Sequence, residues 1–212
     1  MIVQILIDNK NSWIIPFALE LKKILIDKFK SKVYIKHDSD EVTKGDVLIL
    51  LGCEKKFTKL NYNKHNLVVH ESDLPNGKGW SPLTWQILEE KNRIPITLFE
   101  ANKDIDSGDV YFKDFIDLDG SELNTKIKKK QGEKTILLIV KFFENYSKIK
   151  SYKQKGKSTF YSRRDKTHSE LDIDKSINDQ FNLLRVCDNE RYPAFFWKNS
   201  KKYILKIYEE KK

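Results

Sequence analysis

The stretch GDVLILLG, residues 45–52, decides the fold class. It is a continuous apolar run that begins and ends at glycine, and NLVVH at residues 66–70 repeats the pattern. A strand that is apolar at every position is typical of a parallel sheet, because both of its faces are covered. IVQILIDN at residues 2–9 and IPITLFEA at residues 94–101 have the same character, and helical spacing follows at residues 122–146. We therefore predict an open, mostly parallel, Rossmann-like α/β sheet.

The C-terminal part of the chain has a different character. KSYKQKGKS, residues 150–158, is polar, basic and glycine-containing, and it predicts a linker. Beyond it we expect a short helix around residues 178–186, and two strands joined by an Asn199–Ser200 turn. The sequence thus predicts a main domain of residues 1–150 and a small C-terminal α+β extension of residues 151–212.

Composition excludes several classes of protein. No apolar run approaches the roughly 18 residues that span a bilayer, and the N-terminal stretch resembles a strand rather than a signal peptide, so a cytoplasmic location is expected. Cys53 and Cys187 are too few and too far apart for a disulfide framework or a zinc site. The net charge of +9 is explained by solvated surface or by an anionic partner such as a nucleotide, a phosphosugar or RNA.

Polar residues follow the ends of three predicted strands, where open parallel sheets bind ligands. These residues are His70 with Ser72, then Gly52, Cys53 and Glu54, and finally Asp104, Asp106 and Asp109. His70 has the alternative explanation of a satisfied core histidine, and Asp106 that of an Asx turn. For Lys78, in the segment after His70, the alternative is a surface lysine. His65 and His70 are five apart in a strand and would face opposite sides, so we expect no metal there.

A longer motif connects these residues. The order HxSxLPxxxGxxP, followed by DxGD, is formed by His70, Ser72, Leu74, Pro75, Gly79, Pro82, Asp106, Gly108 and Asp109. It resembles the folate-dependent formyltransferase family. FYSRRDKTHSELDIDKS and NLLRVCDNERYPAFF look like the C-terminal part of the sugar-nucleotide N-formyltransferases, so the resemblance extends over residues 45–207.

The resemblance implies transfer of a formyl group from N10-formyltetrahydrofolate to an amine. The family site contains an Asn, a His and an Asp, and the last two match His70 and Asp106. The position of the Asn is Val68 here, and Asn66 would lie about 13 Å from His70 along a strand. Either another group supplies the missing donor, or charged His70 stabilises the oxyanion alone, with Asp106 ionised beside it.

Further roles follow from the same resemblance. The folate is expected against the strand end at Gly52, Cys53 and Glu54, and against the segment that carries Phe99, Asp104 and Ile105. Substrate binding is expected from Ser72, Lys78, Tyr161, Arg163 and Arg164, with Lys78 and the two arginines facing a pyrophosphate. A metal is not implied.

The acceptor implied by the C-terminal part is a nucleotide-linked amino sugar. The motif region looks most like the N-formyltransferase of the pseudaminic acid pathway, which acts on a UDP-linked 4-amino-4,6-dideoxy-altrose derivative in surface glycan biosynthesis. One alternative is a methionyl-tRNA formyltransferase, although 212 residues leave little room for its tRNA-binding domain. Another is a non-catalytic folate or nucleotide-sugar binding protein, suggested by Val68. The resemblance allows a homodimer, and neither a membrane nor a nucleic acid partner is expected.

Overall fold

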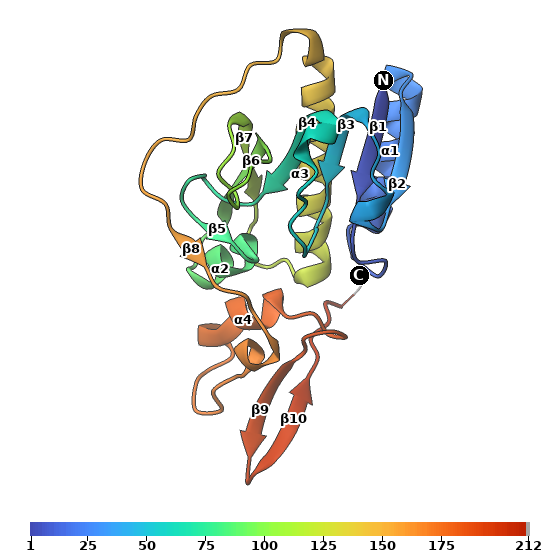
Figure 1. The fold of residues 1–212 in the computed structure, drawn as a ribbon. Helices are drawn as coiled ribbons and strands as arrows, with labels where there is room; N and C mark the ends of the chain where they lie inside the picture. Colours follow the sequence, from blue (N-terminus) through green and yellow to red (C-terminus); the bar gives the residue numbers. More distant parts are fainter. Residues whose placement is uncertain (211–212) are drawn as a thin grey trace.

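A six-stranded sheet forms the centre of the computed structural model, which describes residues 1–210 (Figure 1). Its order is β2-β1-β3-β4-β6-β7, with bounds Lys32–Lys36, Ile2–Leu6, Gly45–Leu50, Asn63–His70, Arg93–Glu100 and Val110–Asp117. The strands β2, β1, β3 and β4 are parallel, whereas β6 runs antiparallel to β4, and β7 antiparallel to β6. The predicted mostly parallel α/β sheet is confirmed, with a reversal at β6 that the sequence pattern did not indicate.

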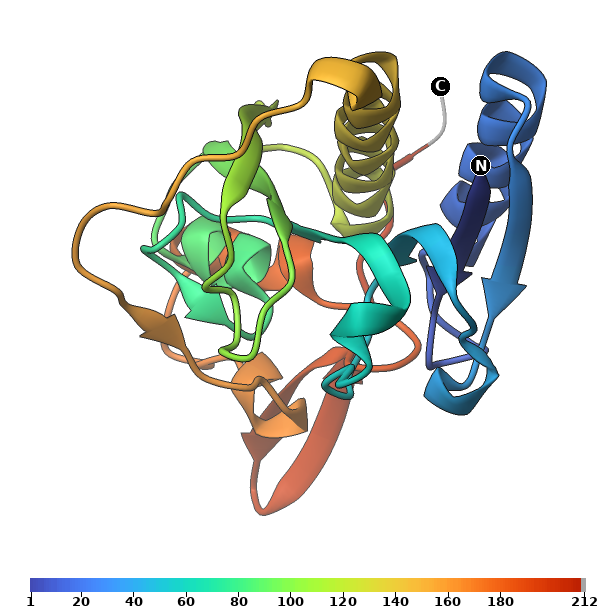
Figure 2. The same ribbon diagram turned by 45° about the horizontal axis from the view of Figure 1, so that its top comes forward.

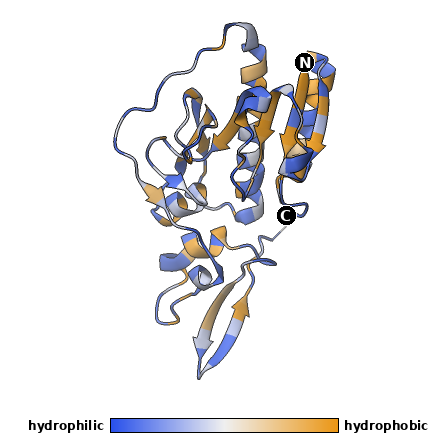
Figure 3. Ribbon diagram, viewed as in Figure 1, coloured by the Kyte–Doolittle hydropathy of each residue, from blue (hydrophilic) through white to orange (hydrophobic). Residues whose placement is uncertain are grey.

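Two long helices cover one face of this sheet. They are α1 (Ile15–Phe29) and α3 (Asn124–Glu144), which contact each other and bury their apolar sides in the main core. Leu21 and Phe142, for example, are completely buried against strand residues such as Ile49. Figure 3 shows the apolar colour concentrated on the central strands. None of the helices in residues 1–210 has the length and apolar character that crossing a bilayer requires.

Loops and short helices cover the opposite face. The 3-10 helices η1 (Ser39–Glu41) and η2 (Leu60–Tyr62) belong to these connections. Two smaller apolar clusters lie there, one around Leu48 and Phe57 and the other around Leu74 and Phe99, and Val68 packs against both. Because side chains alternate along a strand, His70 points to the same face as Val68.

The C-terminal part begins after η3 (Tyr146–Lys148) with an extended segment that reaches β8 (Phe160–Tyr161), which pairs with β5 (Lys78–Gly79). The helices η4 (Lys166–Ser169), η5 (Asn178–Gln180) and α4 (Phe181–Val186) follow, and α4 contacts α2 (Pro82–Leu88). β9 (Ala194–Lys198) and β10 (Lys201–Leu205) form the predicted hairpin, which projects away from the sheet in Figures 1 and 2. Its turn residues, Asn199 and Ser200, both have positive φ.

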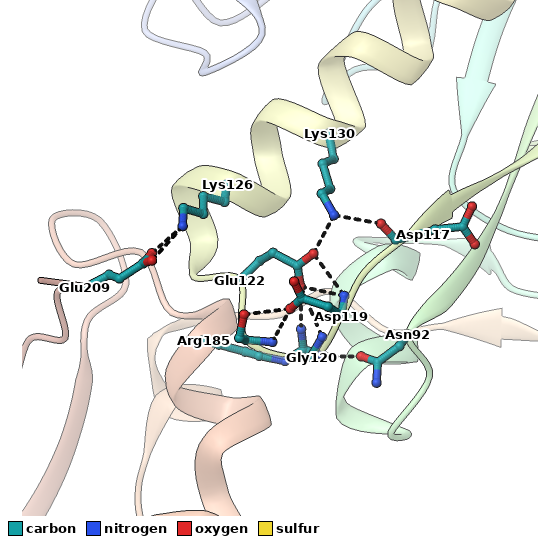
Figure 4. A network of polar contacts seen from close by, with 10 residues as sticks. Asn92, Asp117, Asp119, Gly120, Glu122, Lys126, Lys130, Arg185 and Glu209 are labelled. Carbon is teal, nitrogen blue, oxygen red and sulfur yellow. Dashed lines mark hydrogen bonds and ion pairs between the residues drawn. The ribbon is translucent and has the colours of Figure 1, made fainter. Parts of the chain in front are cut away.

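A buried ionic network joins the C-terminal part to the sheet domain (Figure 4). Arg185 of α4 is 1% exposed and donates hydrogen bonds to Asn92 (2.7 Å) and Asn182 (2.8 Å). Its Nη1 lies 3.8 Å from Glu122 Oε2. Burial acts to raise the pKa of Glu122, but Lys130 and backbone N–H groups lower it below its usual value. The network therefore fixes α4 through an ionised carboxylate just before α3.

Candidate active site

His70 and Asp106 come together on the face opposite the two long helices. His70 Nε2 lies 3.7 Å from Asp106 Oδ2, and the two side chains are 9% and 12% exposed. The sequence analysis placed both residues after the ends of parallel strands, and the parallel direction is wrong for β6. Because β6 is antiparallel to β4, its last residue, Glu100, pairs with Leu67 rather than with His70. The loop of residues 101–109 instead brings Asp106 back over the face onto which His70 points.

The hydrogen bonds of His70 decide its tautomer. His70 Nε2 lies 2.9 Å from the carbonyl oxygen of Gly77. A carbonyl oxygen can only accept, so Nε2 carries a hydrogen and donates it. The bonds formed within residues 1–210 leave Nδ1 for another partner. The imidazole is thus held from one side, through Nε2.

Asp106 is held by a glycine of the same motif. The N–H of Gly79 donates to Asp106 Oδ2 at 2.9 Å. Gly79 has a φ of +96°, and a Cβ atom there would lie 2.5 Å from the carbonyl oxygen of Tyr161. Only glycine fits this position without rearrangement. The spacing between His70 and Gly79 in the motif therefore has a structural cause.

The residues expected to contact a folate fall into two groups. Gly52, Cys53 and Glu54 follow β3, where Asp8 Oδ2 accepts the Glu54 N–H at 2.8 Å. Burial raises the pKa of the Cys53 thiol to about 12, and its sulfur donates to the Leu6 carbonyl, so this cysteine is a structural thiol.

The second group lies on and before the loop of Asp106. Phe99 is 1% exposed and packs with Leu74 and Val110, so its side chain belongs to the core. Asp104 and Ile105 are exposed, the latter by 61%. The structure therefore places only the loop residues where a ligand beside Asp106 could reach their side chains.

A cleft of about 290 Å³ lies between the sheet domain and the C-terminal part. Its lining includes Arg163 and Arg164, and both guanidinium groups lie over tryptophan rings, 4.4 Å from Trp80 and 5.2 Å from Trp85. Arg163 also forms an ion pair with Glu54 at 3.0 Å. The cleft thus combines two guanidinium groups with aromatic surface, and its lining also carries the carboxyl groups of Glu54, Glu71, Asp165 and Asp188.

Lys78, Ser72 and Tyr161 do not line this cleft with the arginines. Lys78 is 6% exposed, and its Nζ donates to Ser107 Oγ at 2.6 Å, next to Asp106. Tyr161 donates to Glu89, while the buried Ser72 Oγ has no hydrogen-bond partner within residues 1–210. Lys78 therefore lies apart from Arg163 and Arg164, with which the sequence analysis grouped it.

The sequence analysis missed a carboxyl group that lines the cleft. Glu71 directly follows His70, and its Oε1 accepts a hydrogen bond of 2.8 Å from Gln131 of α3. Burial raises the pKa of Glu71, while the charge of His70 lowers it and that of Asp106 raises it further. Its position beside His70 was the available signal in the sequence. Gln131 gave none, since it belongs to a polar helical stretch.

Sequence comparisons connect the chain to curated relatives. No family model matches it. It is 28% identical over 168 residues to a methionyl-tRNA formyltransferase of Caldicellulosiruptor saccharolyticus, covering 77% of this chain and 53% of that protein. A methionyl-tRNA formyltransferase of Clostridium beijerinckii is 27% identical over 199 residues, covering 92% and 60%. The chain thus spans about half to three-fifths of the length of these relatives.

Solved structures show the same fold. A methionyl-tRNA formyltransferase from Clostridium thermocellum matches with a TM-score of 0.82 and 23% identity, covering 100% of this chain and 94% of that one. A 4-N formyltransferase from Francisella tularensis gives 0.78 and 18%, covering 99% and 98%. HypX from Aquifex aeolicus in complex with tetrahydrofolic acid gives 0.76 and 16%, covering 97% and 37%. The chain therefore has the formyltransferase fold and is related in sequence to the formyltransferases.

Proposed function

We propose that the protein transfers a formyl group from N10-formyltetrahydrofolate to the amine of a nucleotide-linked amino sugar. The observation that carries this proposal is the approach of His70 to Asp106 at 3.7 Å. Gly77 and Gly79 hold the two side chains from the same loop. The names of the relatives support formyl transfer, and the folate complex of HypX supports the carrier.

The site suits the chemistry of acyl transfer. The acceptor nitrogen attacks the formyl carbon, forms a new C–N bond and creates a tetrahedral oxyanion. Protonated at Nδ1, His70 could donate to this oxyanion, a contribution worth roughly 3–4 kcal/mol. When the bond to the folate nitrogen breaks, that nitrogen gains the proton that the acceptor amine loses. During these steps the carboxylate of Asp106 would balance the positive charge of the imidazolium. No metal enters this scheme.

The folate would lie beside the loop of Asp106. Asp104 and Ile105 present a carboxylate and an exposed apolar side chain there. Gly52 and Cys53, which follow β3, remain proposed contacts through their backbone groups, since the Cys53 thiol already donates a hydrogen bond to the Leu6 carbonyl. Phe99 would support the pocket from the core.

The cleft supports a nucleotide sugar as the acceptor. Arg163 and Arg164 could bind a diphosphate, since guanidinium groups match phosphate oxygens and their stacking on Trp80 and Trp85 orients them. Trp80 directly follows Gly79, whose N–H holds Asp106, so the cleft wall begins one residue from the site. We propose the UDP-linked 4-amino-4,6-dideoxy-altrose derivative of pseudaminic acid biosynthesis as the specific sugar.

A second candidate acceptor is the methionyl group of initiator tRNA. The names of the sequence relatives favour it, and the net charge of +9 suits a nucleic acid. The division into residues 1–150 and 151–212 and a cytosolic location stay predictions from the sequence, and a homodimer stays a possibility that the resemblance allows.

A turnover assay separates these candidates. The protein is incubated with N10-formyltetrahydrofolate and with either the UDP-linked 4-amino sugar or methionyl initiator tRNA, and mass spectrometry detects the gain of a formyl group. We expect formylation of the sugar, lost in His70→Ala and retained in Asp27→Asn, an exposed carboxylate on α1. Formylation of the tRNA and not of the sugar would show that the methionyl group of initiator tRNA is the acceptor. Binding of folate without turnover on either acceptor would indicate a non-catalytic protein.

A further inference from the structure

The segment that connects η3 to β8 is bound along the sheet domain. Figure 1 shows it as an extended path past the ends of β6 and β7. Tyr152 forms an antiparallel bridge with Val110, with hydrogen bonds of 2.8 and 3.0 Å. At its other end, Thr159 accepts the N–H groups of Gly77 and Lys78, at 2.8 and 2.9 Å. We call residues 150–159 the strap, because both of its ends bond to segments that hold the candidate site.

Gln154 in the middle of the strap bonds directly to the loop of Asp106. Its Nε2 donates to the carbonyl oxygens of Asp106 and Gly108, both at 2.9 Å. Both neighbours are acceptors, so the amide must present its NH2 group to them. The two hydrogens of one amide thereby bridge the carbonyls on either side of Ser107.

The bridged loop has a backbone conformation that requires support. Asp106 has a φ of +50°, in the left-handed region, where a residue with a Cβ atom is disfavoured by roughly 1–2 kcal/mol. This conformation carries the carboxylate to the N–H of Gly79 and to His70. Lys78 supports the loop from a second side through Ser107.

We propose that Gln154 is a positioning residue, which holds Asp106 against His70 by bridging the Asp106 and Gly108 carbonyls. It does not touch the reacting groups and acts through the loop backbone. Its effect on turnover rests on the proposed function, whereas its effect on the loop does not. Local pattern does not indicate this role, because a glutamine in a polar, lysine-rich stretch is typical of a solvated connector.

The test compares Gln154→Glu with Gln154→Met. Glutamate keeps the shape of glutamine but replaces the donor Nε2 by an acceptor oxygen that faces both carbonyls, whereas methionine removes the donor without adding this repulsion. If the donor is what matters, Glu is the more harmful change; if packing alone matters, Glu is the better tolerated. Lys155→Ala, an exposed neighbour in the strap, is the control.

Amide hydrogen exchange gives a readout that needs no substrate. The N–H of Gly79 bonds to Asp106 Oδ2, so its exchange reports whether the carboxylate is in place. We expect exchange about tenfold faster in Gln154→Met and faster still in Gln154→Glu, a loss of about 1.4 kcal/mol per tenfold. The N–H of Lys78 bonds to Thr159 and should exchange as in the wild type, showing that the strap stays docked.

Turnover gives the second readout. A misplaced carboxylate should lower kcat by about 100-fold and leave KM for the sugar nearly unchanged. Faster Gly79 exchange in both variants, with no turnover even in the wild type, would support the positioning role and remove the proposed function. Wild-type exchange of Gly79 in Gln154→Glu, or equal effects of Gln154→Glu and Lys155→Ala, would overturn the positioning role.

Discussion

His70 and Asp106 meet at 3.7 Å although their strands, β4 and β6, run in opposite directions. The contact depends on the loop after β6, which turns back over the sheet and is fixed by the Gly79 N–H. The histidine, the glycine and the aspartate of the motif are therefore one unit, because the glycine backbone determines where the carboxylate lies. The unusual φ of Asp106 is a consequence of this arrangement.

Asp106→Gly and Asp106→Ala should separate the roles of the side chain and the backbone at this position. Both variants lose the carboxylate, so kcat should fall by roughly 100-fold or more in each. Glycine adopts positive φ freely, whereas alanine does not, so Asp106→Gly should be the more stable of the two by about 1 kcal/mol. Thermal unfolding of the two variants measures this difference. Equal melting temperatures would show that the backbone at residue 106 is not strained.

Val68→Asn should not raise turnover in the proposed reaction, although it introduces the residue type that the resemblance to formyltransferases implies at this position. Val68 packs against the two small apolar clusters beneath the site. An amide placed among these groups loses its hydrogen bonds to water, which costs roughly 1–3 kcal/mol of stability. We expect turnover equal to or below the wild type, measured beside Val68→Thr as a control of similar shape. A rate increase of about tenfold would mean that the site lacks a donor.

The sequence predicted those features that short patterns encode. Apolar runs identified β3 and β4, and the Asn199–Ser200 turn identified the C-terminal hairpin. The motif predicted that His70 and Asp106 would be neighbours, because motif spacing preserves a three-dimensional arrangement. The assumption that both residues follow parallel strands was wrong, since strand direction is not encoded in an apolar run and β6 is antiparallel to β4.

Other features depend on contacts between distant segments. Lys78 resembles a surface lysine in sequence, yet the loops around it leave it 6% exposed and bonded to Ser107. Gln154 lies in a segment whose composition predicts a linker, and its amide becomes informative only once Asp106 and Gly108 lie beside it. Polar residues of this kind cannot be separated from solvated ones by local pattern, because the same side chains serve both purposes.

The network of Arg185 should respond unequally to the loss of its two charges (Figure 4). Glu122→Gln leaves the charge of Arg185 buried without an anion. It also turns the amide N–H of the new glutamine toward groups that now donate to Glu122. Breaking a buried ion pair in this way typically costs about 3–5 kcal/mol of stability. Arg185→Met removes the buried charge, while Glu122 keeps Lys130 and its backbone donors, so it should cost less. Urea unfolding of both variants tests the order. A more harmful Arg185→Met would show that the bonds of Arg185 to Asn92 and Asn182 dominate.

Glu71→Gln should stabilise the protein increasingly as the pH rises. Burial raises the pKa of Glu71 above the usual value of a glutamate, so the folded state holds this proton more tightly than the unfolded state. A raised carboxyl pKa contributes stability at low pH, and this contribution is lost as the pH rises through the folded-state value. Glutamine is neutral throughout and can still accept the hydrogen bond of Gln131.

The melting temperature of Glu71→Gln should therefore match the wild type near about pH 4 and exceed it near about pH 8. Glu20→Gln, which changes an exposed carboxyl group on α1, serves as the control and should show no such trend. Asp106 raises the pKa of Glu71, whereas His70 lowers it. The gain in melting temperature from Glu71→Gln should therefore be smaller in a protein that also carries Asp106→Asn. A difference that shrinks with rising pH would mean that the cleft stabilises the carboxylate. Glu71 would then be an anion available to a cationic group of the acceptor.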